Sequence, residues 1–130
     1  MLQRFPIYPV LPASDIDRAR TWYEQKLGMT PKVDQEMGLW YECGEGTWLL
    51  VYPTAAAGTA QNTQAHFQVT DIEGLMEELR GRGVTFEEYE GEPFAQMHRG
   101  GGLYEYGAYK TVFIKDSEGN TIEIAQQPQA

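Results

Sequence analysis

The sequence has little of three features that would each indicate a particular class of protein. It has one cysteine, Cys43, which excludes an internal disulfide and a metal cluster built from cysteines. Only 10 lysines and arginines stand against 19 aspartates and glutamates, and the formal charge of -9 disfavours binding to a nucleic-acid backbone. No apolar run approaches a membrane span, and the opening MLQRFPIYPV lacks the basic start and long apolar stretch of a signal peptide. We therefore predict a cytoplasmic protein that binds neither nucleic acid nor membrane.

The sequence also lacks the short motifs of several common enzyme classes. It has no Walker loop, no glycine motif for a dinucleotide after a strand, and no nucleophile-elbow serine. What it has is 130 residues with 42% hydrophobic content, which is enough for one compact domain with its own core. We predict a single domain over residues 1–130.

Two segments carry the pattern of an amphipathic helix. ASDIDRARTWYEQKLG, residues 13–28, begins with Ser14 or Asp15 as the cap and has apolar residues at helical spacing. VTDIEGLMEELRGRGV, residues 69–84, repeats this design 56 positions later, with Thr70 or Asp71 as the cap. An extended segment precedes each helix and candidate strands follow it, so the chain has the pattern of two βαβββ units.

The candidate strands divide equally between the two units. They are residues 30–35, 38–43 and 47–53 in the first unit, and 84–90, 109–115 and 120–126 in the second. A long loop rich in glycine and tyrosine lies at 91–109, which makes the later offset 73 residues, as from Leu50 to Glu123. Neither unit alone covers both faces of its sheet, so we predict one α+β fold with modules at about 5–54 and 62–126.

These segments resemble the vicinal oxygen chelate superfamily, which includes glyoxalase I, extradiol dioxygenases, fosfomycin resistance enzymes and bleomycin resistance proteins. The resemblance is most specific in FIKDSEGNTIEI, which is similar to the family's aromatic-x-x-Asp-Pro-x-Gly-Asn turn and last strand, with Ser117 in place of the proline. It covers Phe5 to Gln126 and implies two modules that form one partly open mixed-sheet barrel around a cavity. It also implies a homodimer, with or without exchange of modules between chains. Because the fold hosts many activities, it implies no particular reaction.

The same resemblance bears on metal binding. In the metal-dependent relatives the ligands come from the first and last strands of each module, and the corresponding positions here are Tyr8, Leu50, Gln64 and Glu123. Glu123 is the only strong donor of the four, and Leu50 offers none, so we predict no metal cofactor. The alternative is one divalent metal ion held by His66 and Glu123, since His66 shares the face of its strand with Gln64.

Strand alternation places aromatic and polar side chains on the cavity side. One of Trp40 and Tyr41 must also face inward. The predicted ligand-binding residues are Tyr8, Trp40, Trp48, Leu50, Tyr52, Gln64, His66, Gln68, Thr121 and Glu123. Aromatic walls with a few polar anchors are typical of a small-molecule site, although aromatic residues also fill the cores of small sheets. The loop at 91–109 is either a lid on this cavity or a surface connector.

We predict a metal-independent small-molecule-binding protein that resembles bleomycin resistance proteins and sequesters an aromatic metabolite or antibiotic. The alternative is a glyoxalase-like lyase or isomerase, or a dioxygenase, with Glu123 as a general base or with His66 and Glu123 holding a divalent metal. A third possibility is an interaction module whose cavity is filled by its own side chains.

Overall fold

The computed structural model describes residues 1–127, with the backbone alone described at positions 98 and 99. The first module contains β1 (Val10–Ala13), α1 (Ile16–Leu27), β2 (Val33–Gln35), β3 (Gly38–Glu42) and β4 (Trp48–Pro53). The second contains β5 (Thr63–Gln68), α2 (Ile72–Gly81), β6 (His98–Gly100), β7 (Leu103–Tyr106), β8 (Tyr109–Lys115) and β9 (Thr121–Gln126). Short 3-10 helices lie at Leu2–Arg4, Gly44–Gly46 and Phe94–Gln96.

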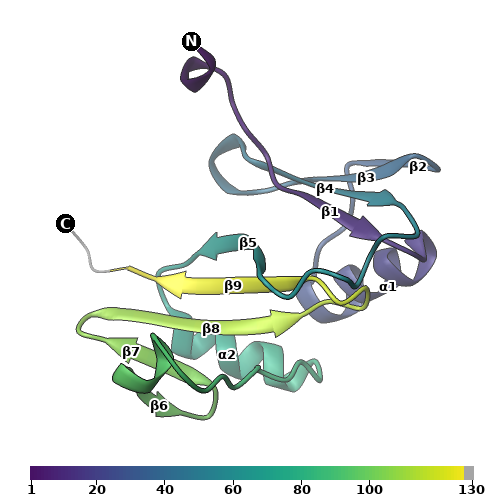
Figure 1. Ribbon diagram of the computed structural model, residues 1–130. Coiled ribbons are helices and arrows are strands. Elements are labelled where there is room, and N and C mark those ends of the chain that lie inside the picture. Colours follow the sequence, from purple (N-terminus) through teal and green to yellow (C-terminus); the bar gives the residue numbers. More distant parts are fainter. Residues whose placement is uncertain (128–130) are drawn as a thin grey trace.

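Each module forms its own mixed sheet. The strand order is β1-β4-β3-β2 in the first sheet and β5-β9-β8-β7-β6 in the second. In both sheets the first strand of the module pairs parallel with its last strand, and the remaining pairs are antiparallel. Figure 1 shows two sheets that do not close on each other, with the N-terminal segment extending away from both. The predicted α+β fold of two similar modules is confirmed.

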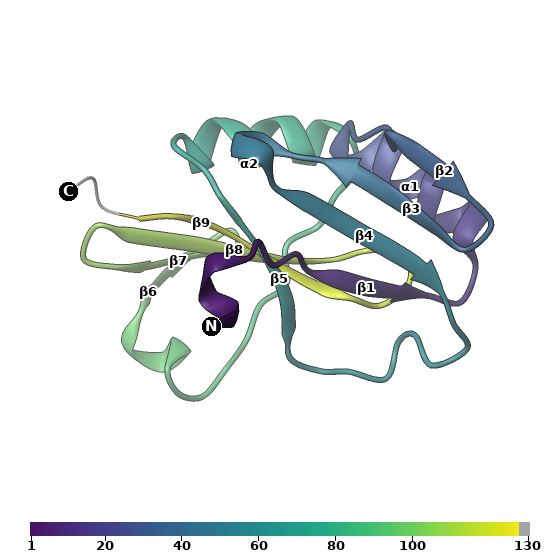
Figure 2. The same cartoon turned by 90° about the horizontal axis from the view of Figure 1, so that it is seen from above.

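The two helices begin and end as their sequences predict. Of the alternative caps, Asp15 and Asp71 are the ones used, and their carboxylates accept hydrogen bonds from the N–H groups of Arg18 (3.0 Å) and Gly74 (3.1 Å). Helix α1 stops at Gly28, whose left-handed backbone (φ 64) suits glycine. In the view of Figure 2 the two helices lie along the same side of the molecule. Neither helix in residues 1–127 is long and apolar enough to cross a lipid bilayer.

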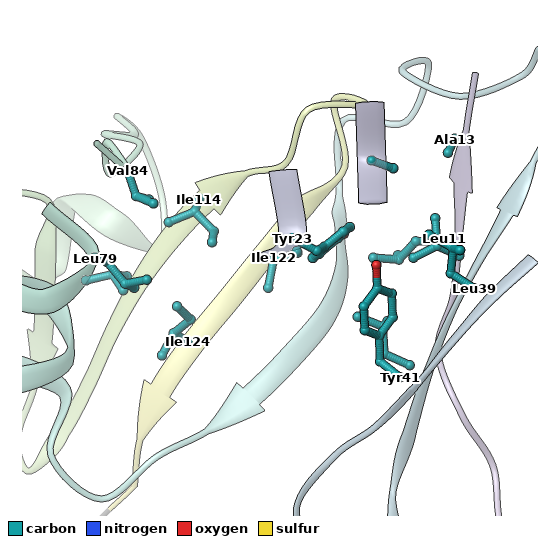
Figure 3. Close-up of a cluster of buried hydrophobic side chains, with 14 of the residues drawn as sticks. Leu11, Ala13, Tyr23, Leu39, Tyr41, Leu79, Val84, Ile114, Ile122 and Ile124 are labelled. Atoms are coloured by element: carbon teal, nitrogen blue, oxygen red, sulfur yellow. The ribbon is translucent and has the colours of Figure 1, made fainter. Parts of the chain in front are cut away.

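The two modules share one hydrophobic core. Leu11, Leu39 and Tyr41 of the first sheet belong to the same buried cluster as Ile122 and Ile124 of the second. Figure 3 shows Tyr23 of α1 between these two groups of side chains. Since apolar burial is the main force that stabilises a fold, this shared cluster holds the modules together.

A polar cluster also joins the modules, at the start of α1. The buried carboxylate of Glu118 accepts hydrogen bonds from Arg18 Nε (2.8 Å), from Arg18 Nη2 (3.0 Å) and from the N–H of Asp15 (3.0 Å). Burial acts to raise the pKa of Glu118, but these bonds and one from Ser117 lower it to about 2. We call this contact the Arg18–Glu118 junction.

The second module departs from the prediction in one place. Residues 84–90 are not a strand, so that prediction is wrong, and the predicted loop at 91–109 contains β6 and β7. The reason is that β7 takes part of the edge of β8 with which residues 84–90 would have to pair. Strand β7 pairs with the first half of β8, up to Thr111, and residues 84–90 reach its second half through one backbone bond, from Glu87 N–H to Phe113 O (2.8 Å).

The segment at 91–109 is packed onto the second sheet. Phe94 and Tyr104 lie against Phe113 of β8, with ring centroids 5.7 and 6.2 Å away. Tyr89 completes this aromatic cluster, at 5.2 Å from Phe113. These contacts favour a structural connector over a lid for this segment.

Candidate ligand-binding site

A polar cluster centred on Glu123 lies on the second sheet. His66 of β5 stands directly opposite Glu123 of the parallel strand β9, and His66 Nδ1 lies 2.9 Å from Glu123 Oε1. Two hydroxyls from β8 donate to the other oxygen, Oε2: Tyr109 at 2.7 Å and Thr111 at 2.7 Å. Glu123 is thus held by three side chains from two neighbouring strands.

These bonds determine the charge of Glu123. Burial raises the pKa of its carboxyl group, but the hydrogen bonds from Tyr109, His66 and Thr111 outweigh burial, so the pKa lies below that of an ordinary glutamate. Burial and the Glu123 carboxylate raise the pKa of Tyr109 to about 12. Glu123 is therefore ionised at neutral pH, and its lowered pKa makes it a weak base.

His66 is the more accessible member of the pair. Its side chain is 35% exposed, compared with 17% for Glu123. An ionised carboxylate can only accept a hydrogen bond, so the proton in this contact belongs to His66 Nδ1. In the neutral ring the lone pair then sits on Nε2, the nitrogen that Glu123 does not contact.

An open groove of about 960 Å³ runs between the modules beside His66. The first module contributes Ile7, Pro9, Cys43, Gly44, Glu45, Thr47, Trp48 and Leu49 to its walls, and the second contributes residues 65–70 and Gln127. Among the predicted ligand-binding residues, the groove brings together Trp48, His66 and Gln68.

A second group of predicted residues lies on the outward face of the first sheet. Trp40 stands opposite Leu50, and the alternation of β4 places Trp48 and Tyr52 on the same face as Leu50. The rings of Trp40 and Trp48 meet edge to face, 6.3 Å apart. Of the two inward candidates on β3, Trp40 is on this face, while Tyr41 is buried in the core. We call Val10, Trp40, Trp48, Leu50 and Tyr52 the aromatic face.

Three predicted residues are placed elsewhere. Gln64 is the extra residue of a β-bulge, and its amide donates to Asn120 Oδ1 (3.0 Å) and accepts from the N–H of Thr121 (3.2 Å). Thr121 is buried and its hydroxyl accepts from Lys115 Nζ (3.2 Å). Tyr8 is half-buried and precedes β1. None of the three lines the groove.

The donor set does not fit a metal ion. Leu50 has no donor atom, the amide of Gln64 is committed to the turn before β9, and both oxygens of Glu123 already accept hydrogen bonds. The alternative pair, His66 and Glu123, supplies two donors that bind each other. Throughout residues 1–127, apart from the side chains at 98 and 99, no three His, Cys, Asp or Glu side chains gather closely enough to hold a metal.

Sequence reasoning missed Tyr109 and Thr111. The signal was present in principle, because Phe113 pairs with Glu123 and Thr111 with Ala125, which makes Thr111 a diagonal neighbour of Glu123. Finding it required the register between β8 and β9, which depends on the turn at 116–120.

Comparison with known proteins identifies the class of this fold. Residues 7–124 match the model of the Glyoxalase/Bleomycin resistance protein/Dioxygenase superfamily, and the chain belongs to that family. No curated protein sequence matches the chain.

Solved structures share the fold along almost the whole chain. A glyoxalase/bleomycin resistance protein from Catenulispora acidiphila is 20% identical, with a TM-score of 0.69 over 95% of this chain and 99% of its own. TnmS3, an antibiotic binding protein from a Streptomyces species, is 20% identical, with a TM-score of 0.63 over 95% and 98%. The fosfomycin resistance protein FosX from Listeria monocytogenes, in complex with Mn(II) and sulfate, is 9% identical, with a TM-score of 0.67 over 95% and 90%.

Proposed function

We propose that this protein binds a small molecule with an aromatic part, without a metal ion, in the groove between its modules. The observation that carries the proposal is that one groove is lined by an indole ring, Trp48, from the first module and by an imidazole, His66, from the second. Aromatic side chains give contact area and a few polar groups fix orientation, as in most small-molecule sites. The antibiotic binding relative TnmS3, which has the same fold, supports a binding role such as sequestration of an antibiotic or metabolite.

The state of Glu123 favours binding over catalysis. Its carboxylate is held by three donors and its pKa is lowered, which opposes a role as general base. The same bonds orient His66, so Glu123 acts on a ligand through that imidazole. In this proposal His66, and not Glu123 as predicted from the sequence, contacts the ligand directly.

We also propose a homodimer. On the aromatic face Val10 is 51% exposed and Trp40 and Tyr52 are each 41% exposed, and Ile7 nearby in the sequence is 92% exposed. An exposed apolar surface of this kind marks an interaction site. A second copy of the chain that covers the aromatic face would place its own residues close to the groove, because Trp48 belongs to both. Sedimentation as a monomer at micromolar concentration would contradict this part of the proposal.

The test of binding is a thermal-shift screen with aromatic metabolites and antibiotics, followed by calorimetric titration of the compounds that raise the melting temperature. We expect Trp48→Leu to weaken binding by about tenfold, the usual order for losing one stacked aromatic contact. Trp40→Leu is the matched control, since Trp40 is on the aromatic face but does not line the groove. Equal losses in both variants would move the site onto the aromatic face. If no compound of a broad panel raises the melting temperature, the proposal is wrong.

One observation favours a second candidate, a lyase or isomerase similar to glyoxalase I. A groove-lining histidine that is oriented by a carboxylate through Nδ1 is a usual arrangement for proton transfer. Turnover lost in both His66→Gln and Glu123→Gln would support this reading. Stoichiometric zinc, manganese, nickel or iron(II) in the purified protein, abolished by Glu123→Ala, would restore the metal alternative.

A further inference from the structure

The internal repeat allows the two junctions between the modules to be compared residue by residue. Val10 pairs with Leu50 in the first sheet, as His66 pairs with Glu123 in the second. These pairs correspond to offsets of 56 residues in the first strands and 73 residues in the last strands, and the caps Asp15 and Asp71 give the same offset of 56 for the helices. By the same offsets, Gly74 is the counterpart of Arg18 and Glu45 is the counterpart of Glu118.

The two glutamates occupy very different surroundings. Glu118 is buried and paired with Arg18. Glu45 is exposed, at a left-handed backbone position (φ 57), and across the described part of the chain no hydrogen bond or ion pair is made by its carboxylate. The position that corresponds to Arg18 in the second module is occupied by Gly74, which has no side chain. We call the place defined by Gly74 and Glu45 the second junction; it has the acid but lacks the base.

The groove lies at this second junction. Glu45 lines it from the turn before β4, and Thr70 lines it from the residue just before the cap of α2. No lysine or arginine is found among the lining residues, all of which lie within residues 7–127. Lys32 Nζ lies 5.9 Å from the centre of the Trp48 ring, and it is paired with Glu42 at 3.0 Å. The Glu45 end of the groove is thus negative and uncompensated.

We propose that the groove takes an organic cation, whose guanidinium or ammonium group pairs with Glu45 as Arg18 pairs with Glu118. Its apolar body lies along Trp48 and Phe67, which line the same groove. A guanidinium or ammonium group makes charge-assisted hydrogen bonds with a carboxylate, and an aromatic ring favours a cation beside it. The inference rests on the proposed binding function and names the charge class of the ligand.

Three probes that share a naphthylmethyl body and differ in charge test this inference: 1-naphthylmethylamine, 1-naphthalenemethanol and 1-naphthaleneacetate. In calorimetric titrations at 0.15 M salt we expect the ammonium probe to bind about fivefold to tenfold more tightly than the alcohol, and the carboxylate most weakly. Glu45→Gln should remove this preference and leave the affinity for the alcohol unchanged. Glu77→Gln, on the exposed side of α2, removes the same formal charge away from the groove and should change nothing.

A second variant supplies the missing base from the chain itself. Gly74→Arg should pair with Glu45 and abolish the preference for the cation, whereas Gly74→Ala should keep it. A Cβ at position 74 would lie 2.5 Å from Asp71 Oδ2, so that carboxylate must turn. The equivalent cap in α1 already carries the side chain of Arg18 beside Asp15, which shows that the helix start accommodates one.

The outcomes separate the two proposals. Equal affinities for the ammonium and alcohol probes would overturn the cation inference and leave the binding function standing. Failure of all three probes, together with an aromatic panel that gives no thermal shift, would overturn both. If Glu45→Gln weakens self-association in sedimentation and leaves the ammonium preference intact, the partner of Glu45 is a basic side chain of a second copy, and the inference is wrong.

Discussion

The same backbone positions carry opposite chemistry in the two modules. In the first sheet Val10 faces Leu50, and in the second His66 faces Glu123. The neighbouring strand also differs between the modules. In the second module it carries the hydroxyl of Thr111, whereas in the first module the corresponding position is Gly38. Glu123 has hydrogen-bond donors on both neighbouring strands, whereas Val10 and Gly38, at the corresponding positions of the first module, have no side chain that could donate.

The two modules supply different kinds of side chain for ligand binding. The aromatic face gives the first module contact area without charge, while the second module supplies an oriented imidazole. A groove between them can offer one wall for stacking and one for hydrogen bonding.

Replacing Glu118 disrupts the Arg18–Glu118 junction. Glu118→Gln removes the charge of a buried carboxylate that binds the N–H of Asp15 and the half-exposed guanidinium of Arg18, so we expect a loss of about 2–3 kcal/mol in the free energy of unfolding. Urea denaturation measures it, with Glu77→Gln as the control for one lost surface charge. A loss below about 0.5 kcal/mol, the size of an exposed pair, would show that the buried geometry adds nothing.

Acid should weaken the same junction. The pKa of Glu118 is lowered to about 2 in the folded protein, so its contribution is fully present above the unfolded value of about 4.3 and is lost as the pH falls toward 2. This contribution is on the order of 2–3 kcal/mol, and Glu123, whose pKa is also lowered, acts in the same direction. Unfolding curves of the wild type and Glu118→Gln should converge between pH 5 and 2. Parallel curves over that range would contradict the assignment.

A glutamate at position 50 would give the first module the acid that the second module has at position 123. Leu50→Glu places a half-buried carboxylate opposite Val10 without hydroxyl or imidazole donors, and we expect it to cost about 2 kcal/mol at pH 7. Because the new carboxyl group is uncharged in acid, part of the loss should be recovered near pH 4. Leu50→Gln serves as the control that has the same shape and no titration. A variant as stable as the wild type at pH 7 would show that the donors are unnecessary.

Removing one donor gives the smallest effect. Thr111→Val keeps the shape of the side chain and deletes its 2.7 Å hydrogen bond to Glu123, so we expect a loss of about 1 kcal/mol and a rise in the pKa of Glu123. An NMR titration of the Glu123 carboxyl carbon measures the pKa directly. No change in that titration would assign the lowered pKa to Tyr109 and His66 alone.

Local patterns predicted what depends on neighbours in sequence. The caps at Asp15 and Asp71 and the helical spacing that follows them are such signals, and both helices formed as expected. The alternation of β5 likewise placed His66 on the face that it shares with Glu123. The family itself was recognisable from these segments and the turn before β9.

What failed depends on contacts between distant segments. Residues 84–90 have a strand pattern, but β7 occupies part of the edge of β8 that they would need. The bulge that turns Gln64 toward Asn120 has no local marker, so strict alternation misplaced that side chain. The groove is likewise a product of how the two modules meet, which no single segment encodes.

The Arg18–Glu118 junction has a consequence for the order in which the chain can fold. Its partners are 100 positions apart, so α1 receives its buried acceptor only after the 100 residues that follow Arg18 have been synthesised. Closing so long a loop is entropically costly and slow, and a first module still attached to the ribosome has to wait until Glu118 is available. Until β9 arrives, the nascent first module exposes the apolar side of its sheet and helix, which makes this interval the one in which aggregation competes with folding.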